Sequence, residues 1–208
     1  MKNILDILKT NNSGIGFNSN SNRSNEKLLV FGITDDIKDE LNFNCDAFIY
    51  KTFTKKKSSN FTGKIISKGD KIDQINNFDF IVINTTSDVD FNIFNYENGI
   101  GLFINENINE ERQNTIESFD FDFLIYDFSI NSYNNLEEIF KIKDIIGTIH
   151  NNWIININTE NFDLEHLQYI YDLGFLGIVL NLSTMNKKSF KSFKTKIAKL
   201  EDRKNDKL

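Results

Sequence analysis

The feature of this sequence that most constrains its fold is the regular recurrence of short apolar runs along almost the whole chain. Each run has the length of a buried strand, and the runs are rich in Ile, Leu, Val and Phe. They are nearly continuous instead of alternating with polar residues, which is typical of parallel strands covered by helices on both faces. The runs are Leu28–Ile33, Ala47–Tyr50, Phe78–Ile83, Gly99–Ile104, Phe121–Tyr126, Ile139–Lys143, Trp153–Ile157 and Gly177–Leu182.

The segments between the runs are polar and partly helical. The clearest helix is predicted over Asp163–Leu173, where Asp163 can cap the first turn and Gly174 suits the position after the last turn. With the runs on either side, this helix forms a βαβ unit, which gives parallel strands and a right-handed crossover. Eight strands joined in this way predict an α/β fold of the (β/α)8 barrel class. A doubly wound open parallel sheet is the alternative.

The length of the chain limits how such a barrel can be built. With 208 residues it is shorter than the roughly 250 typical of this fold, so several crossovers must be shortened. We expect a short helix and an Asn/Ser-rich loop over residues 1–25, and a single barrel domain over residues 26–186. Residues 187–208 are expected to form a basic helix and a polar tail, since they hold nine Lys/Arg and three Asp/Glu. Phe190 and Phe193 are expected to pack this helix onto the domain.

Composition and local motifs exclude several function classes. Cys45 is the only cysteine, which excludes an internal disulfide and a multi-cysteine metal site. No apolar run approaches the roughly 18 residues of a membrane-spanning helix, and the N-terminus does not match a signal peptide, so we expect a cytoplasmic protein. The net charge of −6 argues against nucleic-acid binding. No motif indicates a cofactor or an oligomeric state.

Phosphate-binding signals are weak in this chain. Gly14-Ile15-Gly16 follows no strand, so it does not match a dinucleotide fingerprint. The segments after Ile157 and Leu182 contain no glycine with which to approach a phosphate, and Glu160 would repel one. These signals therefore do not support a phosphate or dinucleotide ligand. We expect a small polar ligand, whose chemistry the sequence does not assign further.

Several segments follow one another along the chain in a characteristic order: Gly14–Phe17, Gly32–Asp35, Asp46–Ile49, Gly99–Glu106, Phe121–Ile125, Ile139–Asp144 and Leu173–Leu180. This order resembles a group of small bacterial TIM-barrel-like proteins to which no reaction has been assigned. The resemblance covers most of the chain and implies a barrel fold, but it carries no catalytic residue. Between Asp144 and Trp153 the chain departs from the group, because a strand–helix unit there is shortened.

In a barrel of this class, function lies at the carboxyl ends of the strands. Two lysines at predicted strand ends, Lys51 and Lys143, are candidate nucleophiles that could form a Schiff base with a carbonyl substrate. Asp35 and Asp127 are candidate acid/base groups. This combination points to a lyase or aldolase-type reaction. The predicted ligand-binding residues at the same end are Asn84, Asn105, Glu106, Asn158 and Asn181.

Other roles for these side chains remain open. Asp and Asn are also favoured as caps of the helix that follows a strand. Asp35, Glu106 and Asp127 could instead hold a Mg²⁺ ion through their oxygen atoms, although no metal site is assigned. The competing hypothesis for the whole chain is a non-catalytic barrel that acts as a scaffold or interaction module, with the N-terminal helix and the basic tail as contact elements.

Overall fold

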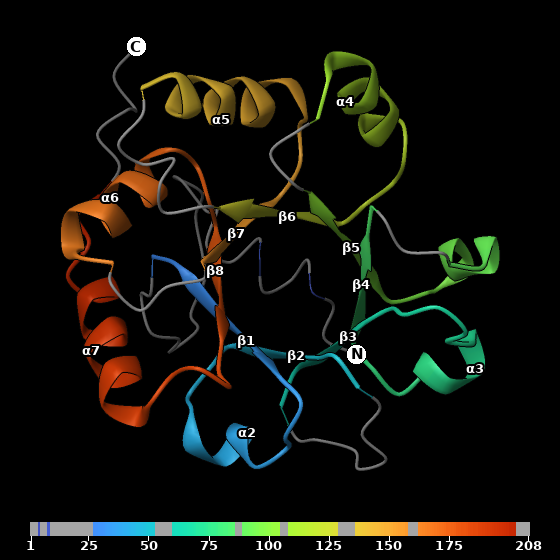
Figure 1. The fold of residues 1–208 in the computed structure, drawn as a ribbon, viewed down its shortest axis with the longest axis horizontal. Coiled ribbons are helices and arrows are strands. Elements are labelled where there is room, and N and C mark those ends of the chain that lie inside the picture. Colours follow the sequence, from blue (N-terminus) through green and yellow to red (C-terminus); the bar gives the residue numbers. More distant parts are fainter. Residues whose placement is uncertain are drawn as a thin grey trace, which may run out of the picture.

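The computed structural model describes Ile4, Leu8 and residues 27–52, 60–85, 89–104, 108–128, 136–157 and 162–202. Within them, eight parallel strands close into a barrel in the order β1 to β8, with the helices outside the ring (Figure 1). The strands are β1 (Leu29–Thr34), β2 (Ala47–Tyr50), β3 (Thr62–Ile65), β4 (Phe80–Asn84), β5 (Gly99–Ile104), β6 (Phe123–Phe128), β7 (Trp153–Ile157) and β8 (Gly177–Asn181).

Closure of the barrel decides between the two predicted folds. Strand β1 pairs in parallel with both β2 and β8, with Leu29 opposite Gly177 and Phe31 opposite Ala47. An open sheet would leave two strands with an unpaired edge, whereas every strand here has two neighbours. The (β/α)8 prediction is confirmed, and the doubly wound alternative is wrong.

Two of the strand predictions need correction. The run Ile139–Lys143 is not a strand, because it lies inside the helix α5 (Leu136–Thr148). The buried side chains Ile142 and Ile145 of α5, and Ile149 just after its end, recur at helical spacing and face the barrel, while Phe140 is 54% exposed. The strand that the prediction lacked is β3, whose sequence Thr-Gly-Lys-Ile is too polar and short to stand out as an apolar run.

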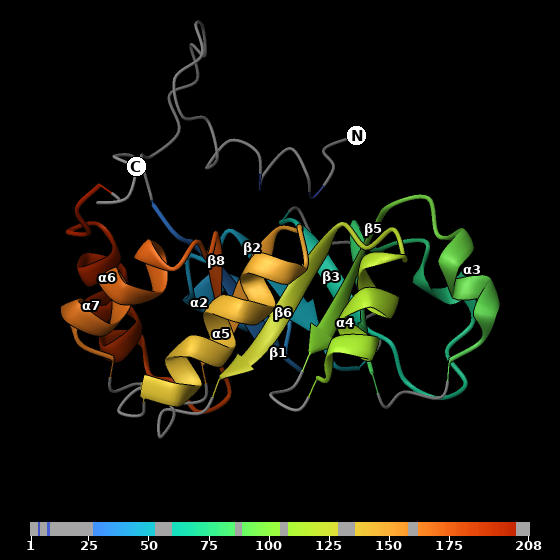
Figure 2. The same ribbon diagram turned by 90° about the horizontal axis from the view of Figure 1, so that it is seen from above.

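The crossovers are short in the first half of the barrel and long in the second half (Figures 1 and 2). The shortened crossovers are thus confirmed. Their predicted place, between Asp144 and Trp153, is wrong, since α5 extends to Thr148. The short elements are α2 (Asp39–Asn42), α3 (Ile72–Ile75) and the 3-10 helix η1 (Phe91–Asn95), and the longer ones are α4 (Glu110–Glu117), α5, α6 (Leu164–Asp172) and α7 (Lys187–Ile197).

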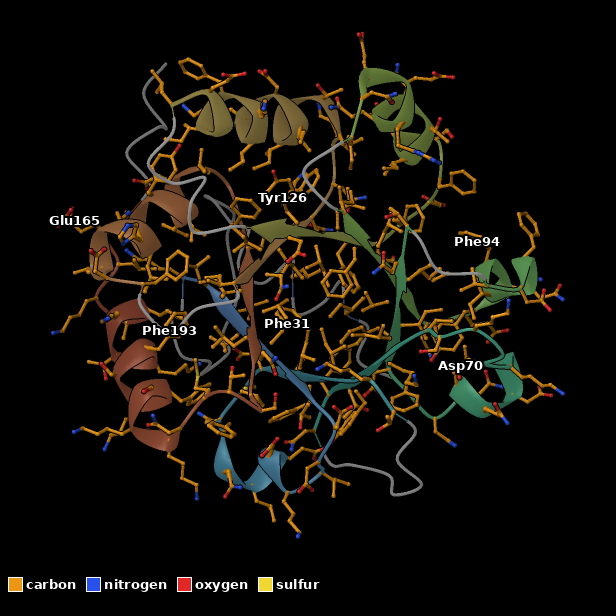
Figure 3. All side chains as sticks on the ribbon, viewed as in Figure 1. Phe31, Asp70, Phe94, Tyr126, Glu165 and Phe193 are labelled. Atoms are coloured by element: carbon orange, nitrogen blue, oxygen red, sulfur yellow. The ribbon has the colours of Figure 1, made fainter. Side chains whose placement is uncertain are left out.

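The barrel interior is filled by large side chains packed against glycines. Phe31, Phe80 and Phe123 are fully buried inside the ring, where Figure 3 shows Phe31. The three rings meet edge to face, with Phe80 lying 6.5 Å from Phe31 and 5.6 Å from Phe123 between centroids. A Cβ atom added at Gly63 or Gly101 would come within 2.2 Å of one of these rings. The glycines therefore create the space that the aromatic rings occupy.

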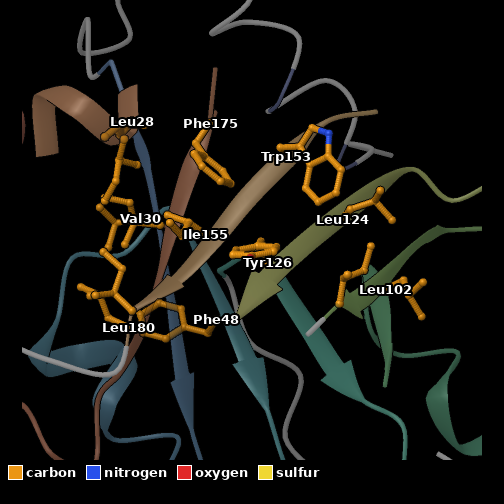
Figure 4. Packing of buried hydrophobic residues seen from close by; sticks show 14 of the residues in the cluster. Leu28, Val30, Phe48, Leu102, Leu124, Tyr126, Trp153, Ile155, Phe175 and Leu180 are labelled. Carbon is orange, nitrogen blue, oxygen red and sulfur yellow. The ribbon is translucent and has the colours of Figure 1, made fainter. Parts of the chain in front are cut away.

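The outer faces of the strands form a second core with the helices (Figure 4). Val30, Phe48, Trp153 and Leu180 belong to it, and the Trp153 indole donates a hydrogen bond to the carbonyl of Ile149, 3.0 Å away. From helix α7, the same core takes Phe190, Phe193 and Ile197, each no more than 5% exposed. The expected packing of the basic helix onto the barrel is confirmed.

Aspartates directly precede three alternate strands and join neighbouring strands at the amino-terminal end of the barrel. Asp46, Asp79 and Asp122 each accept a backbone N–H from the preceding strand, at 2.7–2.8 Å. The sequence Phe-Asp-Phe, which occurs before β4 and again before β6, thus has a structural role at this rim. In the described part of the chain, no helix is long and apolar enough to cross a membrane.

Candidate functional site

A polar pair lies inside the barrel near the carboxyl ends of two neighbouring strands. Asp127 on β6 and Asn156 on β7 are opposite each other in the strand register, and the Asn156 amide donates to Oδ1 of Asp127 at 2.7 Å. Both side chains are partly buried. They continue the faces of Ile125 and Ile154, which belong to the interior core, so the pair faces the inside of the barrel.

Two predicted ligand-binding amides lie at the same end. Asn181 ends β8 on the face of the interior residue Val179, and its Oδ1 accepts hydrogen bonds from the backbone N–H and the hydroxyl of Ser183, at 3.2 and 2.7 Å. Asn84 ends β4 on the face of Val82 and is exposed. Inward positions on β4, β6, β7 and β8 are therefore polar at the mouth, whereas Ile33, Ile65 and Phe103 make the inward positions of β1, β3 and β5 apolar.

Lys51 and Asp35 form the second charged group of the mouth. They directly follow β2 and β1, and the Lys51 ammonium lies 4.0 Å from a carboxylate oxygen of Asp35. The two side chains are 44% and 52% exposed, so water screens their attraction. A lysine nucleophile is activated by desolvation or by a neighbouring cation, and the Lys51 ammonium is too exposed in this structure to be desolvated. Strands β7 and β8 separate β1 from β6, which carries Asp127.

Lys143 does not lie at the mouth of the barrel. This residue was placed at a strand end, but it lies exposed on α5 in the outer helical layer. The basis for its role as a nucleophile is therefore wrong. Asn105, Glu106 and Asn158 lie outside the described residues, so their predicted binding role stays a prediction. Among the described residues, no group of three or more His, Cys, Asp and Glu side chains could hold a metal ion.

Two polar residues near the mouth were missed by the sequence analysis. Asn156 lies within an apolar strand instead of at its end, and a single amide at an inward position of the run Trp153–Ile157 is the signal that could have found it. Lys64 lies in the missed strand β3 and points outward, where it is 1% exposed. Its ammonium donates to the carbonyls of Lys51 and Ile65 and pairs with Asp70 at 3.2 Å.

A hydrogen-bonded network joins α2 to the ends of β1 and β2. The Thr34 hydroxyl donates to Asp39 at 2.5 Å, and the Tyr50 hydroxyl donates to the carboxylate of Glu40. Burial, reinforced by the hydrogen bond to Glu40, raises the pKa of Tyr50 well above its usual value. The phenol is thus held in its neutral, donating form, and the network stabilises the short helix next to Asp35.

Cys45 lies near this network but is not suited to chemistry. Burial raises the pKa of Cys45 to about 12, because desolvation outweighs the attraction of Lys194. The thiol stays protonated near neutral pH and is a poor nucleophile, which agrees with its place beside Gly32 and Leu182 in the outer core.

Comparisons with known proteins support the fold. The tryptophan synthase α-subunit of Pyrococcus furiosus aligns with a TM-score of 0.61 and 11% identity, over 83% of this chain and 96% of that chain. Thiamine phosphate pyrophosphorylase from the same organism aligns with a TM-score of 0.58 and 11% identity, over 83% of this chain and 96% of that chain. N-(5′-phosphoribosyl)anthranilate isomerase, also from Pyrococcus furiosus, aligns with a TM-score of 0.56 and 10% identity, over 82% of this chain and 98% of that chain.

These similarities define the class of protein as a TIM barrel, and at 10–11% identity they show the fold alone. No protein-family model and no curated protein matches this chain. The resemblance to TIM-barrel-like proteins is therefore confirmed at the level of the fold, whereas the group of small bacterial proteins stays a prediction.

Proposed function

We propose that this chain binds a small polar molecule at the carboxyl end of its barrel, with the Asp127–Asn156 pair as the central contact. The observation that carries the proposal is that both residues lie within strands and face inward. They neither follow a strand nor cap a helix, which are the ordinary structural roles of Asp and Asn at a strand end. Placing a carboxylate on the inner face of a barrel costs stability, and a binding role explains that cost.

The arrangement suits a ligand with hydrogen-bonding groups on one side and apolar surface on the other. The Asn156 amide orients the Asp127 carboxylate, which can accept a ligand hydroxyl or amine and can act as a general base. Asn84 and Asn181 add amide groups at neighbouring inward positions, and Phe103 supplies an apolar contact. Because Asp127 is the inward-facing charge among these strand residues, we favour a neutral or cationic ligand over a phosphate ester.

The proposed reaction is of the lyase or aldolase type. In it, the bound substrate excludes water from Lys51, and the Lys51 amine then adds to the substrate carbonyl. Water leaves, and an imine forms that can stabilise a carbanion. Asp35, 4.0 Å from the ammonium, would take up the lysine proton. TIM-barrel neighbours that are named as enzymes agree with a catalytic role, but their identity to this chain is too low to transfer a reaction.

Asp127→Asn is expected to weaken ligand binding at least tenfold while leaving the fold intact. The change keeps the size of the side chain but removes the charge that the ligand contacts. Thermal-shift screening against a metabolite library first identifies ligands, since a ligand present at 100 times its Kd stabilises the native state by about 2.7 kcal/mol. Each ligand is then titrated against the wild type, Asp127→Asn and the matched control Asp144→Asn, which lies exposed on α5. Ligands that shift all three proteins equally would place the binding site elsewhere.

Lys51 is expected to become covalently labelled when the protein is treated with borohydride in the presence of a carbonyl substrate. Reduction converts the imine into a stable secondary amine, which peptide mass spectrometry assigns to one lysine. Lys51→Arg keeps the positive charge and should abolish the adduct, whereas Lys143→Arg should not affect it. If ligands bind but no adduct forms on Lys51, the lyase mechanism fails and the binding proposal remains.

A further inference from the structure

Four phenylalanines form an exposed aromatic cluster on the outside of the barrel. Phe94 stands at its centre, with ring centroids 5.4 Å from Phe91, 5.4 Å from Phe119 and 6.1 Å from Phe121. Phe91 is 76% exposed and Phe119 is 41% exposed. Soluble proteins seldom leave contiguous aromatic side chains in water, and such patches commonly mark interaction sites.

The cluster is built on well-anchored backbone. Phe91 and Phe94 belong to η1, where Figure 3 shows Phe94 at the edge of the molecule. Next to it, Ile93 is buried and the Tyr96 hydroxyl donates to the carbonyl of Phe78 at 2.5 Å. The carbonyl of Phe121 accepts a hydrogen bond from the Asn151 amide at 2.8 Å. The rings are therefore presented by a fixed surface.

This surface lies at the opposite end of the barrel from the candidate site. Phe119 and Phe121 precede β6, and η1 precedes β5, so both segments approach the amino-terminal ends of their strands. Asp127 lies near the carboxyl end of β6. A partner bound to the aromatic cluster would leave the mouth of the barrel accessible, and the proposal is independent of the proposed function.

The charges on the two segments that carry the cluster have one sign. Residues 89–98 and 116–122, which carry the four rings, contain five Asp or Glu residues and no Lys or Arg. Of these, Asp90, Glu97 and Asp120 are exposed, while Glu117 lies 3.2 Å from the ring of His150 and Asp122 accepts the N–H of Ile100. A second copy of this chain meeting the cluster with its own cluster would bring these carboxylates together, so like charges oppose that dimer.

We propose that the cluster is a docking site for a basic segment of a partner protein, in which Lys or Arg residues flank an apolar anchor. The anchor would cover Phe91 and Phe119, and the cations would pair with Asp90, Glu97 and Asp120 and lie against the exposed rings. Charge complementarity favours a basic partner at this cluster, because Asp90, Glu97 and Asp120 attract a cationic segment and repel an acidic one.

The test uses fluorescence anisotropy with three labelled twelve-residue peptides. The first peptide is built from Lys and Leu, the second from Lys and Ser, and the third from Glu and Leu. The Lys–Leu peptide should bind the wild-type protein at least tenfold more tightly than either of the others. The double variant Phe91→Ser/Phe119→Ser should weaken that binding at least tenfold, and so should Glu97→Lys/Asp120→Lys. Both pairs are surface changes, and circular dichroism verifies that the fold is kept.

The matched control is Leu136→Ser/Phe140→Ser, which removes an exposed apolar pair on α5, 63% and 54% exposed, and should leave binding unchanged. Equal binding of the Lys–Leu and Lys–Ser peptides would overturn the proposal, because the attraction would then be general charge only. Unchanged binding by the Phe91→Ser/Phe119→Ser variant would also overturn it. So would a wild-type dimer in sedimentation that this variant converts to a monomer, since a second copy would then be the occupant.

Discussion

Gly101→Ala is expected to destabilise the protein by about 3 kcal/mol, although it adds a single methyl group. The new Cβ would lie 2.2 Å from two ring carbons of Phe123, which is far inside van der Waals contact. Phe123 is fully buried and is itself packed against Phe80, so its ring has no space to move into. Urea denaturation of the purified variant measures the loss.

The matched control is the same substitution at Gly147, in helix α5. There an added Cβ meets nothing within 4 Å, so Gly147→Ala is expected to stabilise the protein by about 0.5–1 kcal/mol through the lower entropy of the unfolded chain. The two variants should therefore change stability in opposite directions. A Gly101→Ala protein as stable as the wild type would show that the interior is not close-packed at this layer.

A second substitution tests whether contact with the ring of Phe123 causes the loss of stability in Gly101→Ala. Phe123→Leu alone leaves a cavity and is expected to cost about 1–2 kcal/mol. Combined with Gly101→Ala, it provides room for the new methyl group, so the double variant should be at least 1 kcal/mol more stable than the sum of the single losses predicts. Additive losses would mean that the ring of Phe123 is not what Gly101 accommodates.

The same packing explains how far the fold could be predicted from the sequence. Apolar runs identified β1, β2 and β4 to β8 because both faces of these strands are buried. Strand β3 could not be recognised as an apolar run, because Ile65 is its only large apolar residue: its other inward position is Gly63, and its outward positions are Thr62 and the charged Lys64. The false strand at Ile139–Lys143 arose because five residues are too few to distinguish a strand from one face of a helix.

The candidate site was predictable where it depends on topology alone. The rule that function lies at strand ends placed Asn84, Asn181, Lys51 and Asp35 at the mouth, because each follows or ends a correctly predicted strand. Lys143 was placed at the mouth wrongly, because the run that it was expected to end lies in helix α5. Asn156 was missed because the rule examines strand ends, whereas the inward direction of a residue within a strand needs the register that pairs it with Asp127.

Lys64→Met is expected to cost about 3–5 kcal/mol, the usual effect of removing one partner of a buried ion pair. The Lys64 ammonium is withdrawn from water, and it is compensated by the carboxylate of Asp70, 3.2 Å away, and by two backbone carbonyls. Methionine fills the same space but leaves the charge of Asp70, which is 11% exposed, without its cationic partner, although the N–H of Ser67 still donates to the carboxylate. Adding Asp70→Asn removes that charge and should recover about half of the loss.

Urea denaturation of these variants is compared with Lys143→Met, an exposed lysine on α5 that should change stability by no more than about 0.5 kcal/mol. Equal effects of Lys64→Met and Lys143→Met would contradict a structural role for the buried ammonium. Lys64 also holds the end of β2, because it binds the carbonyl of Lys51, whose own amide donates to Thr34. Hydrogen exchange at the Lys51 amide should therefore accelerate in Lys64→Met under conditions where the barrel stays folded, and borohydride labelling of Lys51 should fall with it. The buried lysine would then be a positioning residue for the exposed one.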